Sequence, residues 1–280
     1  MRAKRGHVVS VCLPARDEAA TVGRMVVTLR RQLVDAVGLV DEIVVVDDHS
    51  SDRTAQVAAE AGARVVAAED VHPGIVGGHG KGEALWRSLY AATGDLIVWC
   101  DADITDFGAR FVVGLVGPLL LRPDIAFVKG FYERPGDDRN AAGGGRVTEL
   151  MARPLLAAVF PHLASVRQPL SGEYAGRRSL LERLPFVRGY GVDLGLLIDV
   201  AAIVGAERIA ECDLGTRRHR HRDLDELGPQ ALAVLLTALA RSGVETAEPV
   251  ALQRPGREAI TQSFGEIPPV ASLAALVADP

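Results

Sequence analysis

The feature that most constrains the fold is an alternation in the first half of the chain. Short apolar runs rich in β-branched residues alternate with segments of helical periodicity. Residues 8–13 (VVSVCL) form the first run, which Pro14 is expected to end, and apolar side chains then recur at helical spacing from Val22 to Leu33. Such runs are typical of strands buried on both faces of a parallel sheet. The pattern predicts an α/β fold whose ligands gather at the carboxyl ends of the strands.

The same rhythm continues to about residue 130. Further strands are expected at 43–46, 64–67, 96–100 and 125–129, with helices at 54–62, 83–92 and 107–121. The second half predicts a helix at 147–163 kinked at Pro154, helices at 192–204 and 224–241, and a strand at 207–213. Residues 1–130 and 131–245 are therefore expected to be two lobes of one unit, followed by an irregular tail over 246–280.

Composition excludes several classes of protein. A chain of 280 residues with 48% hydrophobic and 24% charged residues can bury a core, so disorder, collagen and coiled coil are excluded. Aromatic residues make up only 5%, and the net charge is −5. Both values argue against nucleic-acid binding, because base stacking needs aromatic side chains and polyanions attract basic proteins.

Cysteine usage and hydropathy indicate the compartment. Cys12, Cys100 and Cys212 are scattered within apolar runs, so buried reduced thiols are expected instead of a disulfide framework. The N-terminal apolar run is too short for a secretory signal, and no segment reaches the ~18 apolar residues of a membrane span. The sequence therefore predicts a cytoplasmic protein without a membrane span.

Two acidic pairs follow predicted strands. Asp101 and Asp103 come after the strand at 96–100, where their carboxylates could bind Mg²⁺ or Mn²⁺ together with a substrate diphosphate. A solvated turn is the alternative, but the position at a strand end favours the metal. Asp47 and Asp48 end the strand at 43–46; they could hold ribose hydroxyls or a base edge, or simply form the turn that caps the next helix.

Two loops could contact a nucleotide. Pro14-Ala15-Arg16-Asp17-Glu18 ends the first strand, and by itself a turn with acids near a helix N-terminus is the better interpretation. The loop at 77–82 (GGHGKG) has glycines and Lys81, as a phosphate cradle would, although it is not a Walker A motif because Gly82 follows the lysine. A flexible loop is an equal alternative there.

The second half contributes basic residues. The run 217–222 (RRHRHR) could be a solvated face or, in the favoured interpretation, an anionic small-molecule pocket with one histidine as metal ligand; a nucleic-acid patch is disfavoured. Arg146 and Thr148 follow three glycines and lead into a predicted helix. That arrangement suits a phosphate or carboxylate, or else a linker before a capped helix.

Together these segments resemble a known family. VSVCLPARDEAATVG, DEIVVVDDHSSDRT, HGKGEALWRSL and GDLIVWCDADI occur in the order seen in family-2-like GT-A glycosyltransferases. GGGRVTELMARPLL, QPLSGEYAGRR, PFVRGYGVDLGLLID and LGTRRHRHRDLDEL closely resemble the glucosyl-3-phosphoglycerate synthases. The resemblance covers roughly residues 8–230.

The resemblance implies a GT-A fold with a nucleotide-sugar-binding lobe (1–130) and a smaller acceptor-binding lobe (131–245). It implies a homodimeric, Mg²⁺- or Mn²⁺-dependent retaining enzyme that moves glucose from UDP-glucose to D-3-phosphoglycerate. The residues it implies for the donor are Pro14, Ala15, Arg16, Glu18, Asp48, Lys81, Asp101, Ala102 and Asp103. Those for the acceptor are Gly145, Arg146, Thr148, Tyr190, Arg217, His221 and Arg222. Asp103 and His219 would bind the metal, and Asp193, Arg217, Asp101 and Asp103 would be the catalytic set.

Two departures from the family pattern leave alternatives open. Asp193 stands where the family has glutamate, and His221 stands where it has asparagine. A different donor such as GDP-mannose or ADP-glucose, or another small anionic acceptor, is therefore the main alternative. A nucleotidyltransferase would carry a Gly-rich first loop, which PARDE is not. A nucleotide-sugar-binding sensor without turnover is the alternative that is not an enzyme.

Overall fold

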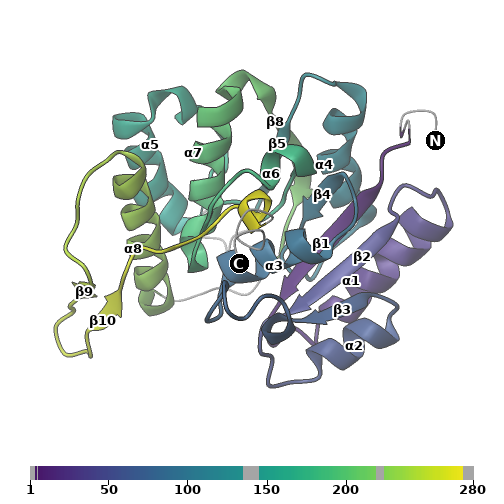
Figure 1. Ribbon diagram of the computed structural model, residues 1–280, viewed down its shortest axis with the longest axis horizontal. Helices are drawn as coiled ribbons and strands as arrows, with labels where there is room; N and C mark the ends of the chain where they lie inside the picture. The colour runs from purple at the N-terminus through teal and green to yellow at the C-terminus, as the bar shows by residue number, and fades with distance from the viewer. Residues whose placement is uncertain (1–3, 5, 135–144, 219–223, 274–280) are drawn as a thin grey trace.

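A seven-stranded mixed sheet runs through the computed structural model, which describes residues 4, 6–134, 145–218 and 224–273 (Figure 1). Its strands are β1 (Val9–Ala15), β2 (Glu42–Asp47), β3 (Arg64–Ala67), β4 (Leu96–Trp99), β5 (Phe127–Glu133), β6 (Tyr174–Arg177) and β8 (Ile209–Thr216). Their order is β3-β2-β1-β4-β6-β5-β8. Only β6 runs antiparallel to its two neighbours, β4 and β5. The predicted α/β architecture is confirmed.

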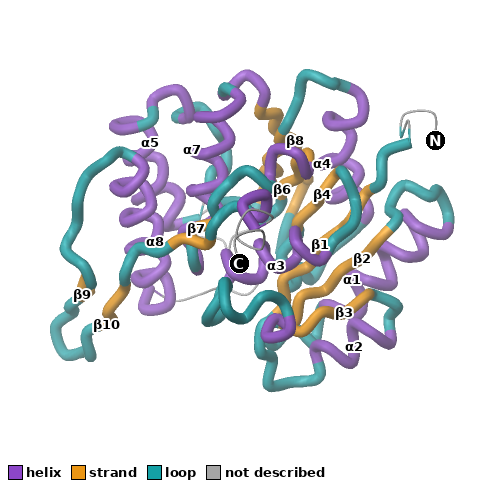
Figure 2. Tube along the Cα trace, viewed as in Figure 1, coloured by secondary structure: helices purple, strands orange, loops and turns teal. Residues whose placement is uncertain are grey.

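Helices cover both faces of this sheet (Figure 2). The longer ones are α1 (Val22–Leu29), α2 (Thr54–Glu60), α3 (Lys81–Ala91), α4 (Ala109–Leu121), α5 (Arg153–Val159), α7 (Val192–Val204) and α8 (Leu224–Arg241). Successive side chains of β1 point to opposite faces of the sheet. Val11 and Leu13 pack with α1 and α4, whereas Cys12 packs with α3 and α7. Helices α5 and α8 extend the second layer by packing on α7.

Shorter elements connect these. Helical turns lie at Arg30–Asp35, Ala68–Asp70, Thr148–Ala152, Pro161–Leu163, Arg178–Leu181 (α6), Gly189–Gly191, Ala206–Arg208 and Val270–Ser272. The expected helix at 147–163 is therefore interrupted. A π-helical turn precedes α5, and Pro154 is the second residue of α5.

Two strand boundaries differ from expectation. Pro14 does not end the first strand but lies within it, opposite Val46 of β2. Pairing with β4 ends at Cys12, so no ladder on that side needs the absent amide. Strand β8 continues to Thr216 instead of ending at 213, so the basic run begins directly at its end.

Strand β6 was missed because its four residues, Tyr174 to Arg177, include no β-branched side chain. Its position is fixed by the slot between β4 and β5, where it pairs with both. Such long-range pairing leaves no local signal in the sequence.

The C-terminal segment is more ordered than the expected irregular tail. β9 (Val250–Leu252) and β10 (Ile260–Gln262) pair with each other, and β11 (Glu266–Ile267) pairs with β7 (Phe186–Val187). Ile267 is buried, and the Trp86 indole N–H donates to the carbonyl of Pro268 at 2.8 Å. Residues 267–272 thus pack against α3, whereas β10 contacts α8.

The cysteines and the helix lengths bear on two further expectations. Cys12 and Cys100 are buried free thiols as expected, whereas Cys212 is only half-buried. In the part of the chain that the structure describes, no helix is long and apolar enough to cross a membrane.

Candidate active site

Asp101 and Asp103 lie just beyond the carboxyl end of β4 and face one guanidinium. Nη2 of Arg217 is 3.0 Å from Oδ2 of Asp101 and 2.7 Å from Oδ1 of Asp103. Arg217 directly follows the last residue of β8, so two strands that are far apart in the chain deliver these side chains. Both carboxylates meet Arg217 although β4 ends at Trp99, so the turn after the strand, and not strand alternation, brings them together.

Lys81, the first residue of α3, is largely shielded from solvent and lies between two carboxylates. Its Nζ lies 2.9 Å from Oδ1 of Asp101 and 3.0 Å from Oδ2 of Asp193. Burial alone would lower the pKa of Lys81, but the attraction of Asp101 and Asp193 outweighs it and raises the pKa above its ordinary value. Burial likewise opposes ionisation of Asp101, yet Lys81 and Arg217 hold the pKa of that carboxyl below its usual range.

Arg217 is anchored from behind by two buried groups. Its Nη1 donates to the Tyr132 hydroxyl at 2.6 Å and lies 3.0 Å from Oε1 of Glu173. Glu173 is fully buried, and this burial raises the pKa of its carboxyl while Arg217 opposes the rise. The guanidinium therefore connects a buried acid on one edge with Asp101 and Asp103 on the other.

Gly172 lets the backbone before β6 approach Asp101. A Cβ at this position would overlap the Asp101 carboxylate, so a side chain here would displace it. The close approach explains the glycine between Ser171 and Glu173 in the motif QPLSGEYAG.

Asp193 opens α7 with both oxygens engaged. The Tyr174 hydroxyl donates to Oδ1 at 3.0 Å, while Lys81 occupies Oδ2. Behind Tyr174, the ammonium of Lys129 lies 4.4 Å from the ring centroid and donates to the carbonyl of Ser171 at 2.7 Å. Burial lowers the pKa of Lys129 to about 8. The Asp193 carboxylate is thus fixed from two sides.

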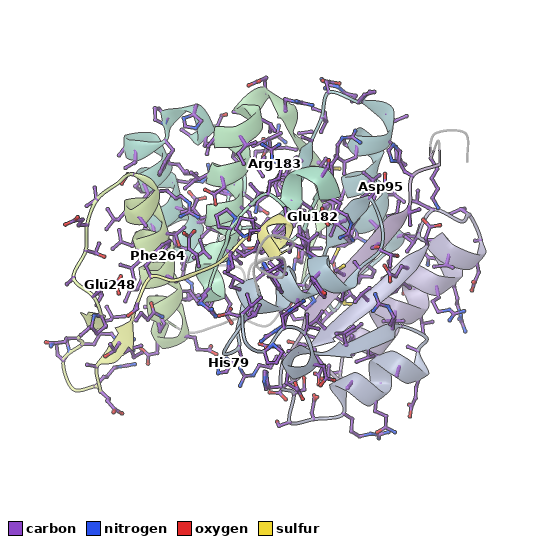
Figure 3. All side chains as sticks on the ribbon, viewed as in Figure 1. His79, Asp95, Glu182, Arg183, Glu248 and Phe264 are labelled. Carbon is purple, nitrogen blue, oxygen red and sulfur yellow. The ribbon has the colours of Figure 1, made fainter. Side chains whose placement is uncertain are left out.

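The predicted nucleotide side lies beside this cluster. Asp48 accepts a hydrogen bond from the amide of Gly80 at 2.9 Å, and its own amide donates to the carbonyl of Ala15 at 2.8 Å. Nη1 of Arg16 is 2.9 Å from Nδ1 of His79, in the loop that precedes α3 (Figure 3). The loop after β1, the loop after β2 and the GGHGKG loop are thereby in contact.

Glu18 is half-buried on the same side. Burial, together with repulsion from Asp103, raises the pKa of its carboxyl to about 7. The Thr21 hydroxyl donates to Oε2 of Glu18 at 3.1 Å. Pro14 and Ala15 are part of β1, and Ala102 is buried between the two aspartates of the DAD sequence.

Apart from Arg217, the predicted acceptor residues that the structure describes lie in two separate turns. The amide of Glu149 donates to the carbonyl of Gly145 at 2.9 Å, which closes the turn that holds Arg146 and the buried Thr148. Tyr190 is 44% exposed in the turn Gly189–Gly191, which leads directly into α7 and Asp193. His219, His221 and Arg222 lie outside the described residues.

The site has a charge balance that suits a divalent cation. The carboxylates of Asp101, Asp103, Glu173 and Asp193 pair with the cations Lys81 and Arg217, so acidic side chains outnumber basic ones among these pairs. Within the described ranges no group of three His, Cys, Asp or Glu side chains is placed to hold a metal. A metal bound at Asp101 or Asp103 would therefore need further ligands from a substrate or from residues outside those ranges.

Sequence reasoning missed Glu173, Tyr132, Tyr174 and Lys129. The only available signal was a charged residue inside an apolar strand sequence, such as Lys129 in FVKGF. Charged residues of this kind are rarely buried unless they are paired. Arg87 was also missed; it is buried in α3 and donates to the carbonyl of Gly78 at 3.1 Å, which fixes the loop before Lys81.

Comparison with known proteins gives a consistent result. Residues 10–141 match the model of glycosyl transferase family 2. The glucosyl-3-phosphoglycerate synthase of Mycolicibacterium smegmatis (strain ATCC 700084 / mc(2)155) is 49% identical over 245 residues, which cover 86% of this chain and 80% of that protein.

Solved structures show the same likeness. The glucosyl-3-phosphoglycerate synthase of Mycobacterium tuberculosis in complex with Mn²⁺, UDP-glucose and phosphoglyceric acid has a TM-score of 0.89 and 45% identity; the match covers 97% of this chain and 93% of that one. The same enzyme in complex with Mg²⁺ and UDP has a TM-score of 0.88 and 44% identity, covering 97% and 94%.

Proposed function

Because the chain belongs to the glucosyl-3-phosphoglycerate synthases, we infer that it transfers glucose from UDP-glucose to D-3-phosphoglycerate with the help of Mn²⁺ or Mg²⁺. One observation of this chain carries the inference. Lys81 joins Asp101 to Asp193, and Arg217 pairs with Asp101, at the carboxyl end of β4, where a GT-A sheet binds its nucleotide sugar.

On the donor side we assign the uridine to the loops after β1 and β2. Pro14, Ala15, Arg16 and Glu18 would line it together with Asp48, whose contact with Gly80 supports a common pocket. Lys81 would reach the donor, Asp101 and Ala102 would lie near the ribose, and Asp103 would hold the metal together with His219. When bound, the metal offsets charge on the departing UDP.

On the acceptor side we assign the phosphate to Gly145, Arg146 and Thr148. Backbone amides at a helical N-terminus and an arginine are suited to a phosphate group. Tyr190 and Arg217 would border the sugar and the acceptor, and His221 and Arg222 would complete the pocket. Residues 1–130 are thus the proposed donor lobe and 131–245 the acceptor lobe; β5, Phe127–Glu133, spans the boundary.

For the retaining chemistry we favour attack on the face from which UDP departs. The bond from the anomeric carbon to the diphosphate oxygen breaks, the bond to the acceptor 2-hydroxyl oxygen forms, and the hydroxyl proton passes to the departing phosphate. A double displacement would need a free carboxylate beside the anomeric carbon. Asp193 has both oxygens engaged, by Tyr174 and Lys81, which argues against its acting as that nucleophile.

The test is UDP release with each metal, using UDP-glucose with and without 3-phosphoglycerate and GDP-mannose in parallel. Release that requires 3-phosphoglycerate and metal, with a product of α configuration by NMR, is the expected result. If UDP-glucose binds but 3-phosphoglycerate causes no turnover, the assigned fold still holds and the assigned acceptor is wrong. Equal turnover of GDP-mannose would overturn the donor.

We also propose a cytoplasmic location and a homodimer. The substrates UDP-glucose and 3-phosphoglycerate are intracellular phosphates, which supports the location. Light scattering during gel filtration tests the dimer: a mass equal to the chain mass of 29.7 kDa, instead of twice that value, would exclude it.

A further inference from the structure

Arg134 follows β5 directly and is half-buried beside the acceptor turn. Its Nη2 donates to the Tyr132 hydroxyl at 3.2 Å, and its guanidinium carbon lies 5.3 Å from the centroid of the same ring. The hydroxyl also accepts a hydrogen bond from Nη1 of Arg217 at 2.6 Å. Two guanidinium groups thus share one phenol oxygen.

The charge of Arg134 is not balanced within the described chain. No carboxylate of a described residue pairs with it, and its Nε is buried without a hydrogen-bond partner. Arg178, Arg217 and Arg241 each pair with at least one carboxylate. A partly desolvated guanidinium without a counter-ion is costly, so an anion from outside the chain would stabilise it.

The neighbours of Arg134 show where such an anion would lie. A Cβ on Gly145 would overlap Nη1 of Arg134, so the acceptor turn packs its backbone directly on this guanidinium. On its other side, the Tyr132 hydroxyl leads to Arg217 and from there to Asp101 and Asp103. Arg134 therefore lies between the turn assigned to the acceptor phosphate and the side chains assigned to the donor.

We propose that Arg134 binds the carboxylate of 3-phosphoglycerate and so selects an acceptor with two anionic groups. This proposal rests on the proposed function. The acceptor has a phosphate at one end, a carboxylate at the other, and the reacting hydroxyl between them. With the phosphate on Gly145 and Thr148, the carboxylate is the remaining anion, and a planar guanidinium can hold it by two parallel hydrogen bonds.

The experiment compares two acceptor probes. Glycerol 3-phosphate keeps the phosphate and the 2-hydroxyl but has a hydroxymethyl group in place of the carboxylate. For Arg134→Gln, the KM for 3-phosphoglycerate is expected to rise ~10- to 100-fold, the range for one charged hydrogen-bonded pair. Glycerol 3-phosphate is tested as a competitive inhibitor against 3-phosphoglycerate, and its inhibition constant is expected to change less than ~3-fold. The KM for UDP-glucose is expected to change equally little, because neither ligand has the carboxylate.

Arg167→Gln is the matched control. Its guanidinium lies 4.3 Å from the ring of Phe131, which points to the opposite face of β5 from Tyr132, and the net charge changes equally. This variant is expected to leave the KM for 3-phosphoglycerate unchanged. Arg134→Lys, which retains the charge but not the planar fork, is expected to lose less affinity than Arg134→Gln and guards against a folding defect.

Each outcome is decisive. Equal weakening of both probes in Arg134→Gln would assign Arg134 to the phosphate and overturn the proposal. An unchanged KM for 3-phosphoglycerate would overturn it too, as would the same rise in Arg167→Gln. If the unsubstituted enzyme does not use 3-phosphoglycerate at all, the proposed function fails, and the failure is visible before any variant is compared.

Discussion

The ammonium of Lys81 lies 3.0 Å from the carboxylate of Asp193, although 112 positions separate the two residues in the chain. Lys81 is the first residue of α3 and Asp193 lies in the first turn of α7. Their ion pair joins helices from the two parts of the chain that we propose to bind the donor and the acceptor. Donor and acceptor binding should therefore depend on each other here.

Substitution of Asp193 should separate the two routes to retention. Asp193→Asn and Asp193→Ala are expected to lower kcat by ~10- to 1,000-fold, because a positioned charge is lost while same-face attack remains possible. Turnover of the purified variants is the measurement, with azide added as an external nucleophile. Loss of all turnover in Asp193→Ala, restored by azide with inverted product, would instead identify an obligatory nucleophile.

Tyr174→Phe should loosen Asp193 without removing it. The phenol hydroxyl is buried and donates to Oδ1 of Asp193, so its loss leaves that oxygen without one partner. We expect kcat/KM for UDP-glucose to fall ~3- to 30-fold, with a destabilisation of about 1–2 kcal/mol. Tyr90→Phe, at an exposed position in α3, is the control and should change neither value. Equal loss in both variants would argue against a specific role for Tyr174.

Arg217→Ala should be far more damaging than Arg217→Lys. Removing the guanidinium leaves Glu173 buried without its counter-ion, which is expected to cost about 3–5 kcal/mol of folding free energy. Arg217→Lys keeps a charge but cannot reach Glu173 and both aspartates at once, so the main expected loss is in kcat/KM. Urea unfolding and steady-state kinetics measure the two effects. Equal stability of the two variants would contradict the assigned pairing with Glu173.

Metal removal should stop turnover without unfolding the site. Arg217 already offsets the charge of Asp101 and Asp103, so the carboxylates do not depend on a metal to remain close together. With EDTA, UDP release is expected to fall to background and to return with Mn²⁺ or Mg²⁺. The thermal midpoint without nucleotide should shift by less than ~2 °C; a large drop would indicate a structural metal.

Glu18 should make stability depend on pH in a defined direction. Its pKa is raised to about 7 in the folded protein, from an ordinary value of 4.5. The folded state therefore binds the proton more tightly than the unfolded state, and the contribution of Glu18 to stability falls as pH rises from about 4.5 to about 7. Glu18→Gln, which has no charge to bury, should gain stability relative to the unsubstituted protein over that range. Urea midpoints at about pH 5 and about pH 8 measure the difference, and a constant difference would contradict it.

Part of this molecule follows from local sequence. The run VVSVCL, the helical spacing from Val22 to Leu33 and the aspartates after LIVWC predicted the α/β fold and one edge of the site. The reason is that period and hydrophobicity determine which segments become buried strands, and parallel strands end at a common edge. The local sequence placed Lys81 in a loop before a helix at 83–92, whereas the structure makes it the first residue of that helix.

The tertiary structure alone decided which charges meet. Strand β6 has no strand-like sequence, yet its insertion between β4 and β5 brings Glu173 and Tyr174 into the site. The sequence at the strand 127–133 and the residue after it does not distinguish Lys129, Tyr132 and Arg134 from ordinary strand residues. Only the packing shows which partners they have. A buried charge is tolerated when its partner comes from a distant segment, and that pairing is a property of three-dimensional contact, which no local pattern along the chain encodes.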